Sequence, residues 1–280
     1  MTEELTDRPW DVGENYPWRG HVLRHLGLVL DFEGDTLVTT MPVGPHVLDS
    51  NGHLLLGALG LLVDLPAGVL SIQSIQPDWT VTFDVETHLV ARPVVGEELR
   101  SVGEIIRKGR NNVITETRVT DASGDMLGQA LVTFTRLPRT ADMTAVPPSG
   151  NRNEMIDPVP LEGRSKLADY LGFRIDPAAG TVQFDPGRRV GNALGAIQGG
   201  VTISSMAAAA ATVASRDLGG PAQATDIHVY YTGLGKVGPF EVRTEVLRAL
   251  GGEALVRCAM VDVGYEERLL ALGTVSARAS

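Results

Sequence analysis

The feature that most constrains the fold is an internal repeat that spans most of the 280 residues. The segment His25-Leu-Gly-Leu-Val-Leu-Asp31 returns as Tyr170-Leu-Gly-Phe-Arg-Ile-Asp176, an offset of 145 residues. Three further matches follow in the same order, at offsets of 143, 142 and 141 residues: Gly52 and Gly57 with Gly195 and Gly200, 84–87 with 226–229, and Asp121 with Asp262. Four matches in register, with a drift that small changes in loop length explain, indicate a duplicated unit.

Each copy of the unit predicts one long helix among strands. Leucine and alanine dominate the apolar stretches 54–71 and 199–217, and their length favours helix over strand. A short strand pair is expected before each helix (26–31 with 36–41, and 171–175 with 181–184), and four alternating runs follow each helix. In the first of these runs, alternation places one set of side chains on a single face: Val81, Phe83, Val85, Thr87 and Leu89.

The chain is expected to divide into two domains. The stretch 137–164 contains five prolines and few apolar residues, so it predicts a linker. An N-terminal extension (1–22), a first domain (23–136) and a second domain (165–280) complete the division. An antiparallel sheet covering an apolar helix is an α+β architecture. Because half of the chain buries its helix poorly alone, we expect the two sheets to join edge to edge.

Composition limits the partners and the compartment. The net charge of -10 argues against nucleic acid and anionic membranes as partners. The apolar run 54–70 contains Asp64 and Pro66 and is shorter than the roughly 20 residues of a membrane span. The acidic start of the chain lacks the basic and apolar blocks of a secretory signal, so we expect a cytoplasmic protein with no membrane partner.

No metal or cofactor is expected. The single cysteine, Cys258, excludes a disulfide framework within the chain and a cysteine-based metal site. The six histidines have no spacing typical of metal ligands.

A glycine-rich segment leads directly into the second predicted helix. It runs Gly191-Asn192-Ala-Leu-Gly195-Ala-Ile-Gln198-Gly199-Gly200. Helix N-termini have unpaired N–H groups and partial positive charge, and glycine lets a ligand oxygen approach them closely. The segment therefore fits an oxyanion-binding site, and it equally fits a tight turn with no ligand.

Asp64 lies in the middle of the first predicted helix, within Leu61-Leu-Val-Asp64-Leu-Pro66. A carboxylate is costly to bury unpaired, and burial raises its pKa unless hydrogen-bond donors reach it. Such residues are candidates for function. The alternative is a structural aspartate bonded to backbone that Pro66 frees.

Together these residues follow a known pattern. Asn-x-x-Gly-x-x-His-Gly-Gly, an Asp nine residues after the His, and a Ser or Thr eighteen residues later are typical of the PaaI-like hotdog thioesterases. The chain resembles this family once per copy, and is similar to its double-hotdog members, in which a fused pair replaces a homodimer. The resemblance implies two hotdog domains, each a long helix wrapped by an antiparallel sheet. It also implies hydrolysis of acyl-CoA thioesters at a site between the two domains.

The two copies retain different parts of this pattern. Copy two has Asn192, Gly195, Gly199 and Gly200, but Gln198 replaces the His, Ala207 replaces the acid and Ala224 replaces the hydroxyl. Copy one has Gly52, Gly57, Asp64 and Thr82, but Asp49 replaces the Asn and Leu55-Leu56 replaces His-Gly. The retained parts are complementary, so we expect one composite site, with the opposite site inactive.

The resemblance implies a role for each retained residue. The Gly199 amide would stabilise the oxyanion, and Asp64 would act as general base or form an anhydride; the sequence favours neither. Thr82 would orient the water or the carboxylate. Asn192 would hold the loop or the nucleophile, and Gly200 would bind substrate. Gln198 puts in doubt any role of the family His in polarising the carbonyl.

The phosphates of CoA require basic residues. Arg107 and Arg110 lie in a turn where the family carries a similar basic segment, and Arg188-Arg189 is the competing candidate. Trp10, Trp18 and the first 20 residues are candidates to cap the site. The resemblance also implies a homo-oligomer of the whole chain.

Two other functions remain open. A hotdog pair that binds acyl-CoA without hydrolysing it would explain the missing His. A hotdog dehydratase or hydratase is disfavoured because neither copy has a His preceded by a suitable Asp at its helix start.

Overall fold

The computed structural model describes residues 16–33, 36–91, 96–140 and 152–280. Copy one contains α1 (Val22–Leu26), β1 (Val29–Glu33), β2 (Thr36–Pro42), η1 (Pro45–Val47), α2 (Leu56–Ser74), β3 (Trp79–Leu89), β4 (Glu98–Lys108), β5 (Asn112–Thr120) and β6 (Met126–Leu137). After it come β7 (Arg152–Glu154), η2 (Leu161–Gly163), α3 (Leu167–Leu171), β8 (Arg174–Asp176), β9 (Thr181–Phe184), α4 (Gly199–Leu218), β10 (Ala222–Tyr231), β11 (Phe240–Leu250), β12 (Glu253–Asp262) and β13 (Arg268–Ala279).

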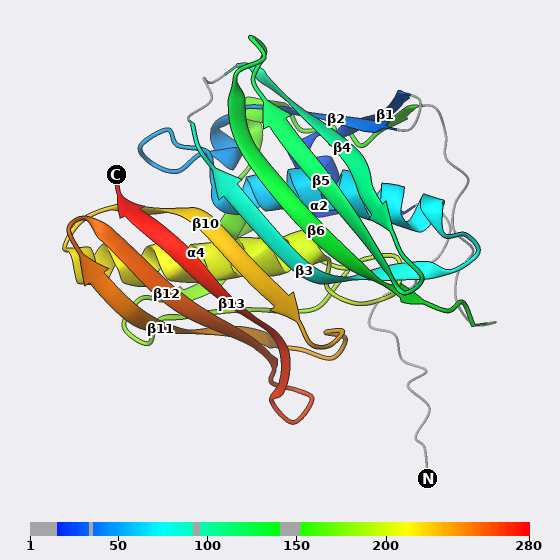
Figure 1. The fold of residues 1–280 in the computed structure, drawn as a ribbon. Helices are drawn as coiled ribbons and strands as arrows, with labels where there is room; N and C mark the ends of the chain where they lie inside the picture. Colours follow the sequence, from blue (N-terminus) through cyan, green and yellow to red (C-terminus); the bar gives the residue numbers. More distant parts are fainter. Residues whose placement is uncertain (1–15, 34–35, 92–95, 141–151) are drawn as a thin grey trace.

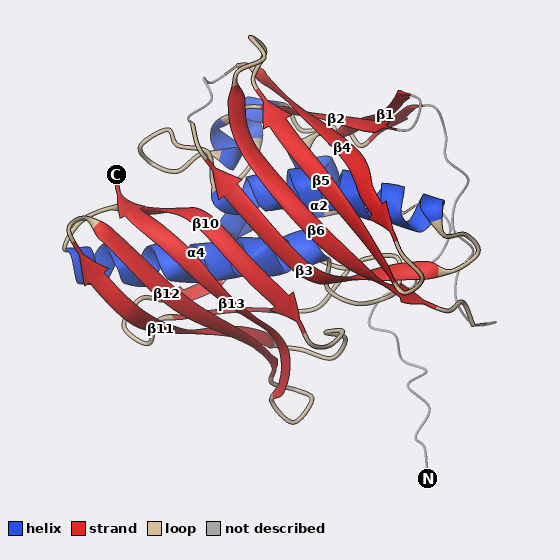
Figure 2. Ribbon diagram, in the orientation of Figure 1, coloured by secondary structure: helices blue, strands red, loops and turns tan. Residues whose placement is uncertain are grey.

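All thirteen described strands form one antiparallel sheet. Its order is β7-β1-β2-β4-β5-β6-β3-β10-β13-β12-β11-β9-β8. The sheet forms one layer, and α2 and α4 lie side by side behind it (Figures 1 and 2). The predicted α+β architecture with one long helix per copy is confirmed.

The two copies join where β3 pairs with β10. Val85 lies opposite Val229, and Glu86 lies opposite His228. Glu86 and His228 occupy equivalent positions in the two copies, so the pseudo-twofold axis passes through this pair. The sheets therefore join edge to edge as predicted, and the chain forms an intramolecular pseudo-dimer.

The two long helices touch through small residues. A Cβ atom on Gly57 would lie 2.7 Å from Ser204 Cα, and one on Gly200 would lie 2.8 Å from Leu61 Cα. Both distances are too short for a side chain, so both positions require glycine. The Ser204 hydroxyl also donates to the Gly57 carbonyl at 2.9 Å. The close contact brings the start of α4 against the middle of α2.

The core surrounds α2 on nearly every side. By length and composition α2 could cross a membrane, but 78% of its most apolar 18-residue window is buried inside the fold. The sheet and α4 therefore cover the helix that is apolar all round.

A β-bulge changes which side chains of β3 face the core, compared with the prediction. The pairing of β3 with β6 shifts between Thr82 and Asp84, which leaves Phe83 as the extra residue. Val85 is buried, but the side chain of Phe83, predicted for the same face, is 48% exposed, so that part of the prediction is wrong. A bulge reverses the alternation of side chains, so the residues before it change face. Val81 is accordingly only half-buried.

The second copy carries the same irregularity. Its pairing of β10 with β13 shifts between Ala224 and Asp226. Ala224 is the counterpart of Thr82, so the bulge belongs to the repeated unit.

The stretch expected to be a linker also adds structure. Within it, β7 pairs with β1 and forms one edge of the sheet. Residues 141–151 of this stretch lie outside the described residues, and the division of the chain into domains at 136 and 165 stays a prediction.

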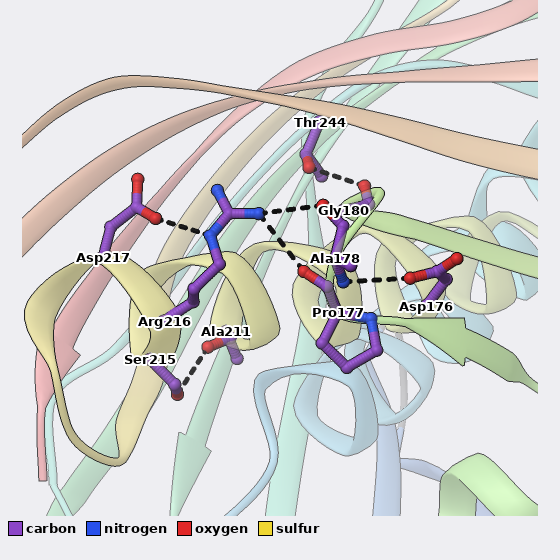
Figure 3. Close-up of polar contacts among 9 residues, drawn as sticks. All are labelled: Asp176, Pro177, Ala178, Gly180, Ala211, Ser215, Arg216, Asp217 and Thr244. Atoms are coloured by element: carbon purple, nitrogen blue, oxygen red, sulfur yellow. Dashed lines mark hydrogen bonds and ion pairs between the residues drawn. The ribbon is translucent and has the colours of Figure 1, made fainter.

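The C-terminal end of α4 is tied to its own copy. The Arg216 guanidinium donates to the carbonyls of Pro177 and Ala178 at 3.2 and 3.3 Å, in the turn between β8 and β9 (Figure 3). Thr244 of β11 donates to the Gly180 carbonyl at 2.6 Å. The opposite end of α4, where the glycines lie, meets copy one.

Candidate active site

Asp64 of copy one and the start of α4 of copy two are in direct contact. The Gly200 N–H donates a 3.0 Å hydrogen bond to Asp64 Oδ2. A Cβ atom on Gly199 would lie 2.8 Å from Asp64 Oδ1, so only glycine allows this approach. The structure therefore brings Asp64, Gly199 and Gly200 together, with the Gly200 N–H bonded to Asp64, and a substrate-binding role for Gly200 stays a prediction.

The environment of Asp64 raises its proton affinity. The residue is 7% exposed, and burial raises the pKa of the carboxyl to about 6. The Gly200 N–H and the Thr82 hydroxyl partly offset this by lowering the pKa. The Thr82 side chain lies beside Asp64. The bulge after Thr82 turns this side chain toward α2.

One oxygen of Asp64 has no partner. Within the described residues, Oδ1 is buried and lacks a hydrogen bond. Unsatisfied buried oxygens are rare in folded proteins, and one on a carboxylate is costly. Oδ1 is thus available to a water molecule or a reacting group.

Asn192 holds the glycine loop together. Its Oδ1 accepts from the N–H groups of Leu194 and Ala196 at 2.9 and 3.1 Å, and its Nδ2 donates to the Ile197 carbonyl at 3.2 Å. Of the two roles expected for Asn192, these contacts correspond to holding the loop.

Gln198 and Gly199 form the entry to α4. Gln198 is at the N-cap position, 5% exposed, and its buried Oε1 has no partner among the described residues. The Gly199 N–H is the first of α4, and within the same described ranges it has no acceptor. Gly199 therefore lies next to the unsatisfied Oδ1 of Asp64, and it follows Gln198, whose Oε1 is also unsatisfied among the described residues.

Tyr231 at the end of β10 is a site residue that the sequence reasoning missed. Its hydroxyl donates to the Gly199 carbonyl at 2.8 Å. Burial raises the pKa of Tyr231 well above its usual value, and the charge of Asp64 adds to the shift. The repeat contains a signal for this residue, because its counterpart in copy one is the apolar Leu89.

The N-terminal segment packs over the glycine loop. Trp18 is 7% exposed and clusters with Tyr16 and with Ala193 of the loop. His21 Nε2 donates to the Gly191 carbonyl at 2.8 Å, since its Nδ1 accepts from the backbone. Trp18 therefore lies where a cap was expected, and Trp10 lies outside the described residues.

The opposite site has apolar side chains where the Asp64 site has Gln198, Gly199, Asp64 and Thr82. Leu56 is buried where copy two has Gly199, and Ala207 and Ala224 are buried where copy one has Asp64 and Thr82. Leu55, at the position of Gln198, is partly buried. Nothing at these positions matches the chemistry of the Asp64 site.

Asp49 performs the structural task of its counterpart Asn192. Its Oδ1 accepts from the N–H groups of Asn51 and His53, both at 2.8 Å. His53 Nδ1 lies 3.3 Å from Asp49 Oδ2, which agrees with a loop role for His53.

The two candidate phosphate-binding pairs lie in different places. Arg107 lies near the end of β4 and Arg110 lies in the turn that leads to β5, and Lys108 between them donates to the Ser74 carbonyl at the C-terminal end of α2. Arg189 lies before the glycine loop, with its guanidinium 4.9 Å from the centre of the Tyr170 ring. No group of three His, Cys, Asp or Glu side chains in the described part of the chain has the arrangement of a metal site.

Known structures share this fold over nearly the full chain. A structure from Novosphingobium aromaticivorans, described as a putative thioesterase, matches with a TM-score of 0.61 at 16% identity, covering 90% of this chain and 98% of that one. The tesB protein of Mycobacterium avium subspecies paratuberculosis matches with a TM-score of 0.62 at 13% identity, covering 89% and 95%. The chain has the double-hotdog fold.

A third match is an acyl-ACP thioesterase from Bacteroides thetaiotaomicron, with a TM-score of 0.59 at 15% identity, covering 87% of this chain and 98% of that one. No family model and no curated protein sequence matches the chain. At these identities the double-hotdog fold is what the structural matches establish.

Proposed function

We propose that the protein hydrolyses acyl-CoA thioesters at a single site composed of both copies. The observation that carries the proposal is the contact between Asp64 and the start of α4, which leaves Asp64 Oδ1 and the Gly199 N–H without partners in the described structure. An unpaired carboxylate oxygen beside an unpaired helix N–H provides a base and an oxyanion donor a few ångströms apart. The matching structures from Novosphingobium aromaticivorans and Bacteroides thetaiotaomicron, described as a putative thioesterase and an acyl-ACP thioesterase, support the same reaction.

The geometry suggests how the reaction proceeds. The thioester carbonyl oxygen accepts from the Gly199 N–H, where the partial positive charge of α4 stabilises the oxyanion. Asp64 either takes a proton from an attacking water or attacks the carbonyl carbon itself. In both routes the C–S bond breaks, CoA leaves as its thiolate and is protonated, and water supplies the oxygen of the acid. Thr82 holds the carboxylate, and Tyr231 and Asn192 hold Gly199 and its loop.

Acyl-CoA binding without hydrolysis is the second candidate. It is favoured by Gln198, whose neutral amide stands where the family carries His and whose Oε1 lacks a partner within the described residues. The NH₂ group of Gln198 could still donate a hydrogen bond to a carbonyl oxygen, but the neutral amide has no charge with which to polarise that carbonyl.

A hydrolysis assay separates the two candidates. Purified protein is incubated with a panel of acyl-CoA and acyl-carrier-protein thioesters, and the released thiol is measured. Hydrolysis that Asp64→Asn abolishes supports the proposal. Binding of an acyl-CoA in the absence of any hydrolysis would support the second candidate instead.

Several further properties belong to the same proposal. We assign the protein to the PaaI-like subgroup on its motif, divide it into domains 23–136 and 165–280, and place it in the cytoplasm. Arg107 and Arg110 bind the CoA phosphates, with Arg188 and Arg189 as the alternative. Loss of affinity for CoA itself after changing either pair to Gln identifies the phosphate-binding pair.

A homo-oligomer completes the proposal. Phe83, Leu131 and Tyr230 are each at least 40% exposed, and all three belong to strands at or beside the β3–β10 junction. Burying exposed apolar side chains between copies of the chain would stabilise the assembly. Light scattering measures the mass of the particle in solution.

A further inference from the structure

The segment 16–21, which we call the strap, crosses from copy one onto the glycine loop of copy two. The Val22 N–H donates to the Arg189 carbonyl at 3.1 Å, and Tyr170 donates to the Gly20 carbonyl at 2.8 Å. With the bond from His21 to Gly191, these contacts fix the strap beside the residues that precede α4.

The strap places two aromatic rings beside the glycine loop. Tyr16 and Trp18 meet edge to face with ring centres 5.2 Å apart, and Trp18 packs on Ala193, the residue after Asn192. Tyr16 also packs against the main core. Burial and the charge of Asp64 raise the pKa of Tyr16, as expected for a phenol near that carboxylate.

Copy two has a matching strap with different side chains. Its Lys166 donates to the Leu48 carbonyl at 2.9 Å, just as His21 donates to Gly191 in the repeat. The positions of Tyr16 and Trp18 are taken by Leu161 and Gly163. The anchoring of the strap is thus common to both copies, whereas the two aromatic rings occur only at the Asp64 site.

A thioester bound at Asp64 must point its two ends in different directions. The CoA end carries phosphates that stay in water, because burying their charge is costly. The acyl end is apolar and is suited to an apolar wall. The largely buried rings of the strap are therefore suited to contact the acyl end of the substrate.

On the basis of the proposed function, we propose that Tyr16 and Trp18 form the wall that limits the acyl end of the site and restricts it to short acyl groups. Each added CH₂ that cannot be accommodated reduces kcat/KM roughly 10–200-fold, which corresponds to about 1–3 kcal/mol. Two large rings beside the glycine loop leave room for few such groups.

The test is a chain-length profile of kcat/KM, from acetyl-CoA to decanoyl-CoA, for the full chain and its variants. Trp18→Leu and Tyr16→Leu remove ring volume but keep an apolar side chain. Each should shift the preferred substrate by at least two carbons and raise kcat/KM for decanoyl-CoA about tenfold relative to acetyl-CoA. Tyr16→Phe keeps the ring and should retain the chain-length preference of the parent protein.

Leu161→Ala is the matched control, because it changes the equivalent position of the strap that lies away from Asp64. Its profile should equal that of the parent protein. A uniform loss across all substrates in the Trp18 and Tyr16 variants, or an unchanged profile, would show that the strap only supports the loop. If the parent protein hydrolyses no thioester, the proposed function fails and the wall fails with it.

Discussion

The Gly200 N–H donates to Asp64 Oδ2 at 3.0 Å across the contact between α4 and α2. The donor belongs to copy two and the acceptor to copy one, so neither copy contains the pair alone. The partial positive charge at the start of α4 acts on the same carboxylate. The equivalent residue to Asp64 in copy two is Ala207, so the reciprocal contact cannot form.

Asp64→Asn should reduce kcat at least ~10²-fold, because an amide neither accepts a proton from water nor attacks the thioester. Binding of a non-hydrolysable acyl-CoA analogue should stay nearly intact. The melting temperature should be unchanged or higher at pH 7.5, since the variant removes a buried charge. Turnover, calorimetric binding and thermal unfolding are measured on one preparation. A large drop in melting temperature with little change in kcat would indicate a structural aspartate.

Ala207→Asp is the matched change at the opposite site. It should not create a second active site, because Leu56 stands where the carbonyl would need a glycine. A doubling of turnover, or rescue of Asp64→Asn by Ala207→Asp, would contradict the assignment.

The pH dependence of kcat/KM should follow the ionisation of Asp64. Since the carboxyl must be ionised and its pKa is raised to about 6, activity should be half-maximal near pH 6 and level above it. Thr82→Val removes a hydroxyl that lowers this pKa, so its acid limb should move to higher pH. A pH series in buffers of constant ionic strength measures both profiles. If the acid limb of Thr82→Val does not move, Thr82 does not lower the pKa of Asp64.

One acyl-CoA analogue should bind per chain. Asn192→Ala loosens the loop and should reduce the activity of the Asp64 site. The double variant with Asp64→Asn should lose far less activity than the product of the two single fold-losses. Asp49→Ala loosens the matching loop of copy one and should leave activity within a few-fold of the parent protein. Calorimetric titration gives the stoichiometry. Two molecules per chain would show that both sites bind.

Tyr231→Phe should lower kcat by roughly 3–10-fold with little change in KM, since a hydrogen bond worth about 1 kcal/mol no longer holds the Gly199 carbonyl. Tyr230→Phe is the control, because the neighbouring ring is 48% exposed. Steady-state kinetics compare the two variants. Equal effects of Tyr231→Phe and Tyr230→Phe on kcat would show that Tyr231 has no positioning role.

Acid should destabilise the fold through buried histidines. Burial lowers the pKa of His46 from its usual 6.5 to about 4. The unfolded chain therefore binds more protons between these values, so stability falls as pH drops from about 6.5 toward 4. In His46→Leu the melting temperature should fall less between pH 7.5 and 5 than in the parent protein. Identical slopes for both proteins would contradict this contribution.

The sequence by itself determined the repeat, the two long helices and the complementary loss of site residues. Local features suffice for these. Helix length follows from the run of apolar residues, and the offset of about 143 residues aligns Asp64 with Ala207 and Gly199 with Leu56 without any knowledge of contacts. The joined sheet also follows, because an apolar helix has to be covered.

Only the tertiary structure decided how the site is assembled. The pairing register of β3 and β6 creates the bulge that exposes Phe83 and turns Thr82 inward. The approach of α2 and α4 decides that Gly200, rather than Gly199, bonds Asp64. The roles of Tyr231 and of the strap depend on contacts with segments far away in sequence. Register and helix approach are set by packing among distant residues, and the pattern of any one segment does not contain them.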